Sequence, residues 1–107
     1  MEKKKLHQIE REIRRIKKQL GEIGDMRPGS LTKQYRDPNE KKGPYYQISY
    51  THKMKSRTDY VRPMFIKETR LQINNYKRFK ILTEKWIELS IKSAKLRMEI
   101  AKKEFSD

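Results

Sequence analysis

Residues 6–23 read LHQIEREIRRIKKQLGEI, and this stretch decides the fold. Its aliphatic side chains recur at alternating steps of three and four residues, which is the a/d repeat of a coiled-coil helix. A helix over residues 2–23 with one apolar stripe is barely stable alone, so it needs a partner along that stripe. The seam consists of Leu6, Ile9, Ile13, Ile16, Leu20 and Ile23.

The residues after this seam predict the end of the helix and a turn. Gly24 is expected to stop the helix, because glycine accepts the left-handed conformation that follows a helix end. Pro28 and Gly29 suit the two central positions of a type II turn. This turn should lead the chain out of the helix and toward a first strand.

A second helix is expected over residues 63–105. Pro63 suits a first helical turn, and only Asn74-Asn75 offers a weak point for a break. One stripe of this helix comprises Phe79, Leu82, Trp86, Leu89, Ser93, Leu96 and Ile100. A second stripe comprises Ile87, Ile91, Ala94, Met98, Ala101 and Phe105. Two stripes allow two neighbours, the first helix and the same helix of a second chain, so we expect a homodimer.

Between the helices, residues 31–62 predict an antiparallel β-hairpin region. Residues 45–51 and 56–61 alternate as strands around a basic tip at 52–55, and residues 31–35 offer a third strand. Residues 36–44 are polar, contain two prolines, and should form a loop. The expected fold is α+β and mostly α, with two or three strands and coiled-coil-like helix packing, in a single domain over residues 1–107.

The charge of the chain indicates a polyanionic partner. Lys and Arg number 28 against 14 Asp and Glu, a net charge of +14 in only 107 residues. Net charge is +3 over residues 1–26, +6 over 27–62 and +5 over 63–107, so the middle third has the highest charge density. Such an excess favours DNA, RNA or anionic surfaces as partners.

Basic residues and tyrosines interleave across the hairpin, which is the pattern of a nucleic-acid contact surface. The candidate binding residues are Arg36, Lys41, Lys42, Lys53, Met54, Lys55 and Arg57. Tyr46, Ile48 and Tyr50 share one strand face and are expected to pack on the helices. Met54, between two lysines at the tip, either acts as a wedge between base steps or has no role.

The sequence offers nothing for catalysis or metal binding. It contains no cysteine, and its two histidines are 45 residues apart. No nucleophile has a nearby base, and no glycine loop could cradle a phosphate. We therefore expect no enzyme activity, no metal and no cofactor. No long apolar run or signal-peptide core is present, and neither helix suits a membrane surface, so a cytoplasmic, nucleoid location without membrane partners is expected.

Four ordered strings in the chain carry a resemblance. They are MRPGSL at residues 26–31, GPYYQISYT at 43–51, KSRT at 55–58 and YVRP at 60–63. With them the chain resembles a family of small, uncharacterised basic proteins of bacteria and archaea that carry this core between two helices. Its members often have cysteines between the first two strings and a glycine at the position of Met54. This chain has neither, and the resemblance implies the helix–hairpin–helix layout without an activity.

Together these features predict a small, dimeric, non-enzymatic DNA-binding protein of low sequence specificity, nucleoid-associated or regulatory. Its basic aromatic hairpin would contact the nucleic acid. One alternative is a scaffold protein whose heptad seam recruits another helical protein. Another is an RNA-binding protein, which preference for a single-stranded ligand would indicate.

Overall fold

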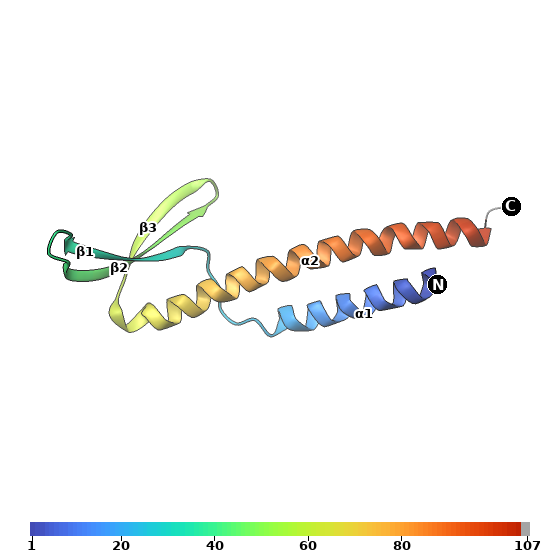
Figure 1. The fold of residues 1–107 in the computed structure, drawn as a ribbon, viewed down its shortest axis with the longest axis horizontal. Helices are drawn as coiled ribbons and strands as arrows, with labels where there is room; N and C mark the ends of the chain where they lie inside the picture. Colours follow the sequence, from blue (N-terminus) through green and yellow to red (C-terminus); the bar gives the residue numbers. More distant parts are fainter. Residues whose placement is uncertain (106–107) are drawn as a thin grey trace. The chain divides into compact units, whose positions relative to one another are not determined.

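The computed structural model of the chain describes residues 1–105 and confirms the α+β class. In chain order the elements are α1 (Glu2–Gly21), β1 (Ser30–Asp37), β2 (Lys42–His52), β3 (Lys55–Val61), a 3₁₀ turn (Pro63–Phe65) and α2 (Ile66–Phe105) (Figure 1). Contacts divide the chain into two compact units. The helix unit comprises Met1–Ile23 and the chain from Phe79 onward, and the sheet unit comprises Gly24–Arg78. The helix α2 contributes to both.

In the helix unit, α1 packs against the C-terminal part of α2, as the two periodic seams predict (Figure 1). Ile16 of α1 and both Leu82 and Leu89 of α2 are buried at the centre of this contact. Around them pack the partly buried side chains of Ile9, Ile13, Leu20, Ile23 and Trp86. Each helix thereby covers the apolar stripe that the other could not leave in water.

Ion pairs along the edges of the seam show that the two helices run antiparallel. Lys3 Nζ lies 2.6 Å from Glu104 Oε1, and Glu10 Oε1 lies 3.4 Å from Arg97 Nη2. Glu2 pairs with Lys103. The hydrogen bond from Lys103 lowers the pKa of Glu2 and raises that of Lys103, and Glu104 likewise raises the pKa of Lys3. These are exposed pairs, so they set the direction of packing more than its strength.

The end of α1 differs from the prediction. The helix ends at Gly21, the next residue, Glu22, has a right-handed conformation (φ −92°), and Gly24 does not adopt a positive φ. The segment after the helix is tied to α2. Asn75 Nδ2 donates to the Asp25 carbonyl at 2.9 Å, within an unbroken α2. The expected stop at Gly24 is wrong, whereas α2 runs unbroken through Asn74-Asn75, as predicted for a long second helix.

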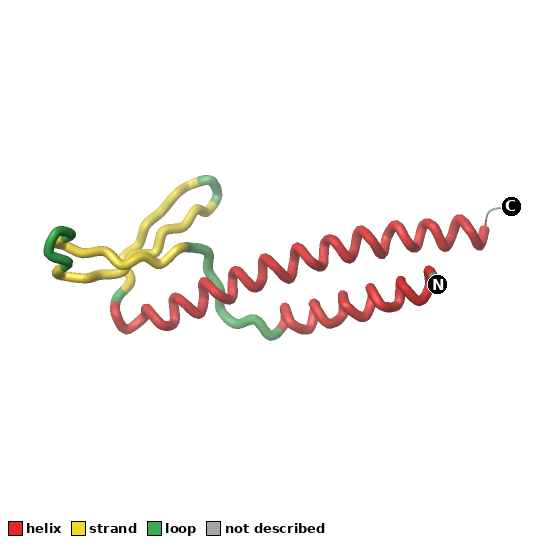
Figure 2. Tube along the Cα trace, in the orientation of Figure 1, coloured by secondary structure: helices red, strands yellow, loops and turns green. Residues whose placement is uncertain are grey.

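The strands form one antiparallel sheet of order β1-β2-β3, so the third strand is present (Figure 2). The polar loop predicted over 36–44 is reduced to residues 38–41, because β1 continues to Asp37 and β2 begins at Lys42. The Glu40 amide donates to Asp37 Oδ1 at 3.2 Å and closes this turn. Pro44 interrupts the alternating pattern, so the sequence did not indicate that β2 begins at Lys42. A proline is accepted near the beginning of a strand, where it is not accepted in the interior.

The core of the sheet unit is built around Ile48 of β2, whose side chain is completely buried. It packs with Val61 of β3 and Ile73 of α2, and the partly buried Leu31, Tyr46 and Ile66 complete the cluster. The N-terminal part of α2 therefore covers one face of the sheet, the face that carries Ile48.

Gly29 is required by the close approach of the backbone to this core. The type II turn predicted at Pro28-Gly29 is not formed; Gly29 has a φ of 142°, and the chain runs directly into β1. A Cβ at Gly29 would lie 2.7 Å from Ile48 Cγ1 and 2.8 Å from Ile48 Cδ1. Both the backbone conformation and the space exclude a larger residue.

We expect Gly29→Ala to destabilise the sheet unit by about 2–4 kcal/mol, from the disfavoured φ and the overpacking against Ile48. All six tyrosines lie in the sheet unit, whereas Trp86 is the only tryptophan and lies in the helix unit. Urea unfolding followed by tyrosine near-ultraviolet circular dichroism and by Trp86 fluorescence therefore measures the units separately. The control is Gly21→Ala, where a Cβ meets nothing within 4 Å; it should be neutral or slightly stabilising. Equal effects of the two substitutions would contradict the prediction.

Candidate nucleic-acid interface

The buried Ile48 determines which sheet residues face solvent. Side chains alternate along a strand, so Gln47 and Ser49 point away from α2 when Ile48 points toward it. The strand register places Thr32 and Tyr60 beside Gln47 on this second face. We call it the outer face, and it consists of Ser30, Thr32, Gln34, Arg36, Tyr45, Gln47, Ser49, Thr51, Ser56, Thr58 and Tyr60.

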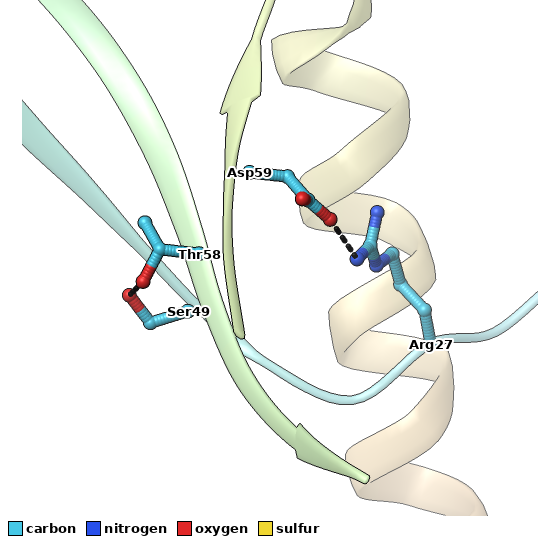
Figure 3. Close-up of polar contacts among 4 residues, drawn as sticks. All are labelled: Arg27, Ser49, Thr58 and Asp59. Carbon is cyan, nitrogen blue, oxygen red and sulfur yellow. Dashed lines mark hydrogen bonds and ion pairs between the residues drawn. The ribbon is translucent and has the colours of Figure 1, made fainter. Parts of the chain in front are cut away.

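The outer face bears hydroxyl and amide groups, with one cation, Arg36, and no acidic residue. Ser49 Oγ and Thr58 Oγ1 lie 3.2 Å apart across β2 and β3, and Thr51 and Ser56 form a matching pair at 3.3 Å. These hydroxyls are exposed, and each can rotate to donate to or accept from a ligand. Figure 3 shows the Ser49–Thr58 pair on the side of the strands away from α2.

The predicted binding residues gather at the two opposite ends of the sheet. The first cluster, at the β1–β2 turn, contains Arg36, Lys41 and Lys42. The second cluster, at the β2–β3 turn, contains Lys53, Met54, Lys55 and Arg57. Between the turns lie the 11 residues of β2, about 33 Å at the usual rise of a strand. The structure thus brings together two cationic ends with the outer face between them, and not one cluster of seven residues.

The β2–β3 turn is tighter than the four-residue tip expected from the sequence. Only Lys53 and Met54 lie between His52 and Lys55, with φ angles of 51° and 64°. Two central residues at positive φ define a type I′ turn, which matches the twist of the strands but normally contains Asn and Gly. The side chain of Met54 is 98% exposed. An apolar side chain is therefore held in an unfavourable backbone conformation at the outermost point of a basic hairpin.

The two ends differ in how their charges are compensated. At the β1–β2 turn, Lys42 Nζ lies 3.0 Å from Glu40 Oε2. Within residues 1–105 no ion pair is assigned to Lys53, Lys55 or Arg57. The whole sheet unit contains 13 Lys and Arg against five Asp and Glu, a net charge of +8. The cations at the β2–β3 turn are thus available to an anionic ligand, as are Arg36 and Lys41 at the other end, to which no ion pair is assigned either.

On the helix side of the sheet, Arg27 has a structural position. Its guanidinium lies over the Tyr50 ring, 5.0 Å from the centroid. It also lies 4.0 Å from Asp59 Oδ2, the contact drawn in Figure 3. Its backbone amide donates to the Gln72 carbonyl at 3.2 Å. A cavity of about 420 Å³ beside it is lined by both acids and cations, among them Asp59, Glu68 and Arg62. This mixture of charges does not favour an anion there.

The remaining predicted residues lie in the helix unit. Leu6 and Leu96 are half-buried at its contact, alongside the buried residues already described. In the described part of the chain, no three His, Asp or Glu side chains are grouped so that they could hold a metal ion. No described helix has the length and apolar character needed to cross a membrane.

The chain belongs to a family defined by a domain of unknown function, DUF6788, which matches residues 6–70. The match spans the α1 seam, the whole sheet and the first turn of α2. No curated protein and no solved structure matches the chain.

Of the outer face, only Arg36 is among the residues that the sequence predicted to bind nucleic acid. The signal was present in the alternation of β2, where Gln47, Ser49 and Thr51 occupy the face opposite the apolar one. A face of uncharged hydrogen-bonding groups in a basic segment indicates a surface that contacts a ligand by hydrogen bonds as well as by charge.

We expect Met54→Gly to stabilise the sheet unit by about 0.5–1 kcal/mol, because glycine relieves the positive φ at some cost in chain entropy. The measurement is the urea midpoint followed by tyrosine circular dichroism. Lys55→Gly, one residue later in β3, is the control and should destabilise, because glycine weakens a strand. A midpoint for Met54→Gly at or below that of the unsubstituted chain would show that the turn carries no strain.

Proposed function

We propose that this protein is a non-enzymatic DNA-binding protein that contacts duplex DNA through the sheet unit. The observation that carries the proposal is the outer face, a sheet surface with hydroxyl and amide groups and no acid, between two cationic ends; it is exposed except at half-buried Tyr45 and Gln47. Cations neutralise phosphates and supply most of the affinity, and polar side chains contact base edges. The expected sequence specificity is low, because the phosphate contacts that supply most of the affinity carry no sequence information.

A β-ribbon or small sheet fits the major groove of B-DNA, which is about 12 Å wide. Gln side chains pair with adenine, and Ser or Thr hydroxyls accept or donate to either base type. In this arrangement Gln47 and Ser49 at the centre of β2 face the bases, and Lys53, Lys55 and Arg57 reach the phosphates that border the groove. Exposed Met54, at the turn, lies where a wedge between base steps would have to lie.

A second candidate is binding of single-stranded nucleic acid, which the tyrosines of the outer face favour. Tyr60 is exposed and pairs with Gln47 in register, and half-buried Tyr45 lies two residues before Gln47 on the same face. Sheet aromatics can stack on unpaired bases, whereas the major groove of duplex RNA is too narrow for side chains. Duplex RNA is therefore the least suitable ligand.

The scaffold alternative rested on the free seam of the first helix. That seam packs against α2 of the same chain, so it offers no free stripe for a partner. Nucleic-acid binding accordingly remains the function that the exposed surfaces favour.

The first test replaces Lys53, Lys55 and Arg57 together by Gln. If each contacts a phosphate, binding to duplex DNA weakens at least about tenfold near 100 mM salt, and the slope of log affinity against log salt falls by about 3. Fluorescence anisotropy with a labelled 20-base-pair duplex at three salt concentrations measures both. Gln substitution of Arg11, Arg15 and Lys18, three exposed cations of α1, removes the same charge and should have a much smaller effect. Equal losses from the two triple variants would refute a contact at the β2–β3 turn.

The second test separates the outer face from general charge attraction. Gln47→Ala and Ser49→Ala change no charge, so they leave the salt slope unaltered and weaken binding to duplex DNA by about 5- to 30-fold if both contact bases. Competition between duplex and single-stranded DNA of equal length is measured in the same assay. Preference for the single strand, with binding lost in Tyr60→Ala, would favour the second candidate. An unchanged affinity of the Gln47/Ser49 variant for every ligand would exclude the outer face as the contact surface.

A further inference from the structure

The second apolar stripe of α2 lies exposed in the helix unit. Ile87 is 54% exposed, Ile91 51%, Met98 66% and Phe105 83%, and Ala94 and Ala101 between them are also exposed. At 100° per residue this stripe is about 140° around the helix from the seam that contacts α1. It therefore faces away from α1, and nothing in the described chain covers it.

This stripe is regular enough to be a coiled-coil seam. Its six residues follow one another at steps of 4, 3, 4, 3 and 4 over 19 residues, a length of about 28 Å. A scattered exposed apolar residue needs no explanation, but a continuous stripe with heptad spacing marks an interaction surface. Ile81, also 66% exposed on α2, does not belong to the repeat.

The side-chain sizes along the stripe fit a second copy of the same stripe in antiparallel orientation. With the two copies centred between Ala94 and Met98, each Ala94 faces a Met98 and each Ala101 faces an Ile91. Every small side chain then meets a large one, which fills the layers between two helices. In a parallel, in-register pair the alanines would face alanines in two separate layers and leave space unfilled.

The charges beside the stripe favour the same orientation. In the antiparallel register Glu88 of each copy lies beside Lys102 of the other, which gives two attractive pairs. In the parallel register Arg97 of each copy would lie beside Lys102 of the other, which gives two repulsive pairs. Lys95 and Arg97 meet their own copies at the antiparallel axis, but Arg97 is compensated by Glu10 of α1. The stem of Lys95 is long enough to turn its ammonium outward.

We propose that the occupant of this surface is a second copy of the chain, bound antiparallel through the second stripe of α2. The two α2 helices form the centre of the dimer, and each keeps its own α1 on the opposite side. The interface is then formed by residues of the helix unit alone. This inference does not depend on the proposed DNA binding, because the stripe belongs to the helix unit.

Sedimentation equilibrium of the full chain, from about 1 to 200 μM, tests the association. The unsubstituted chain should be a dimer in this range, and Ile91→Asn with Met98→Asn should raise the dissociation constant at least about 100-fold. Both side chains are exposed, so the double variant keeps its α1–α2 packing, which Trp86 fluorescence checks. Ile81→Asn is the matched control and should remain dimeric. A monomeric unsubstituted chain at 200 μM, or a dimer unaffected by the double substitution, would refute the proposal.

Charge reversal then tests the orientation, because the two registers predict opposite signs. Lys102→Glu places like charges together in the antiparallel dimer and should weaken it about tenfold at low salt. In a parallel dimer the same substitution removes a repulsion and strengthens association. Adding Glu88→Lys to Lys102→Glu restores the attractive pairs and should restore the original dissociation constant. A stronger dimer in Lys102→Glu, or no recovery in the double variant, would refute the antiparallel register.

Discussion

The burial of Ile48 is the contact on which the sheet unit depends. This side chain packs with Val61 of β3 and Ile73 of α2, and it occupies the space that a side chain at Gly29, before β1, would need. Because strand residues alternate, burying Ile48 against α2 forces Gln47 and Ser49 to the solvent side. A slip of one residue in register would reverse the two faces. The core contact and the proposed DNA-binding surface therefore both follow from the burial of Ile48 against α2.

The helices could be predicted from the sequence because their signal is long. Six aliphatic residues at heptad spacing specify α1, and two stripes specify a long α2. The predictions that were wrong concern details of the helix ends, which depend on tertiary contacts. Gly24 looks like a helix stop, yet α1 ends at Gly21, and the chain after it is held by a hydrogen bond from Asn75. Nothing in the local sequence encodes that hydrogen bond across 50 residues.

The candidate site was only partly predictable for a related reason. The cations of the hairpin are visible in the sequence, but their separation to opposite ends follows from the third strand and the length of β2. The strain at Met54 also could not be read locally, because a four-residue basic tip places no demand on φ. It appears once the register pairs His52 with Lys55 and leaves two residues for the turn. The strand register, which long-range pairing sets, determines that the hairpin cations lie at the two ends of the sheet with the outer face between them.

The two units use their charges in different ways. In the helix unit, Glu2, Glu10 and Glu104 pair with cations across the α1–α2 contact. These ion pairs favour the antiparallel orientation of the two helices. In the sheet unit the two pairs found among the described residues, Arg27–Asp59 and Glu40–Lys42, involve two of the five acids, and the β2–β3 turn retains three unpaired cations. Unpaired like charges raise the free energy of a folded chain unless a counter-charge binds, and a polyanion supplies one.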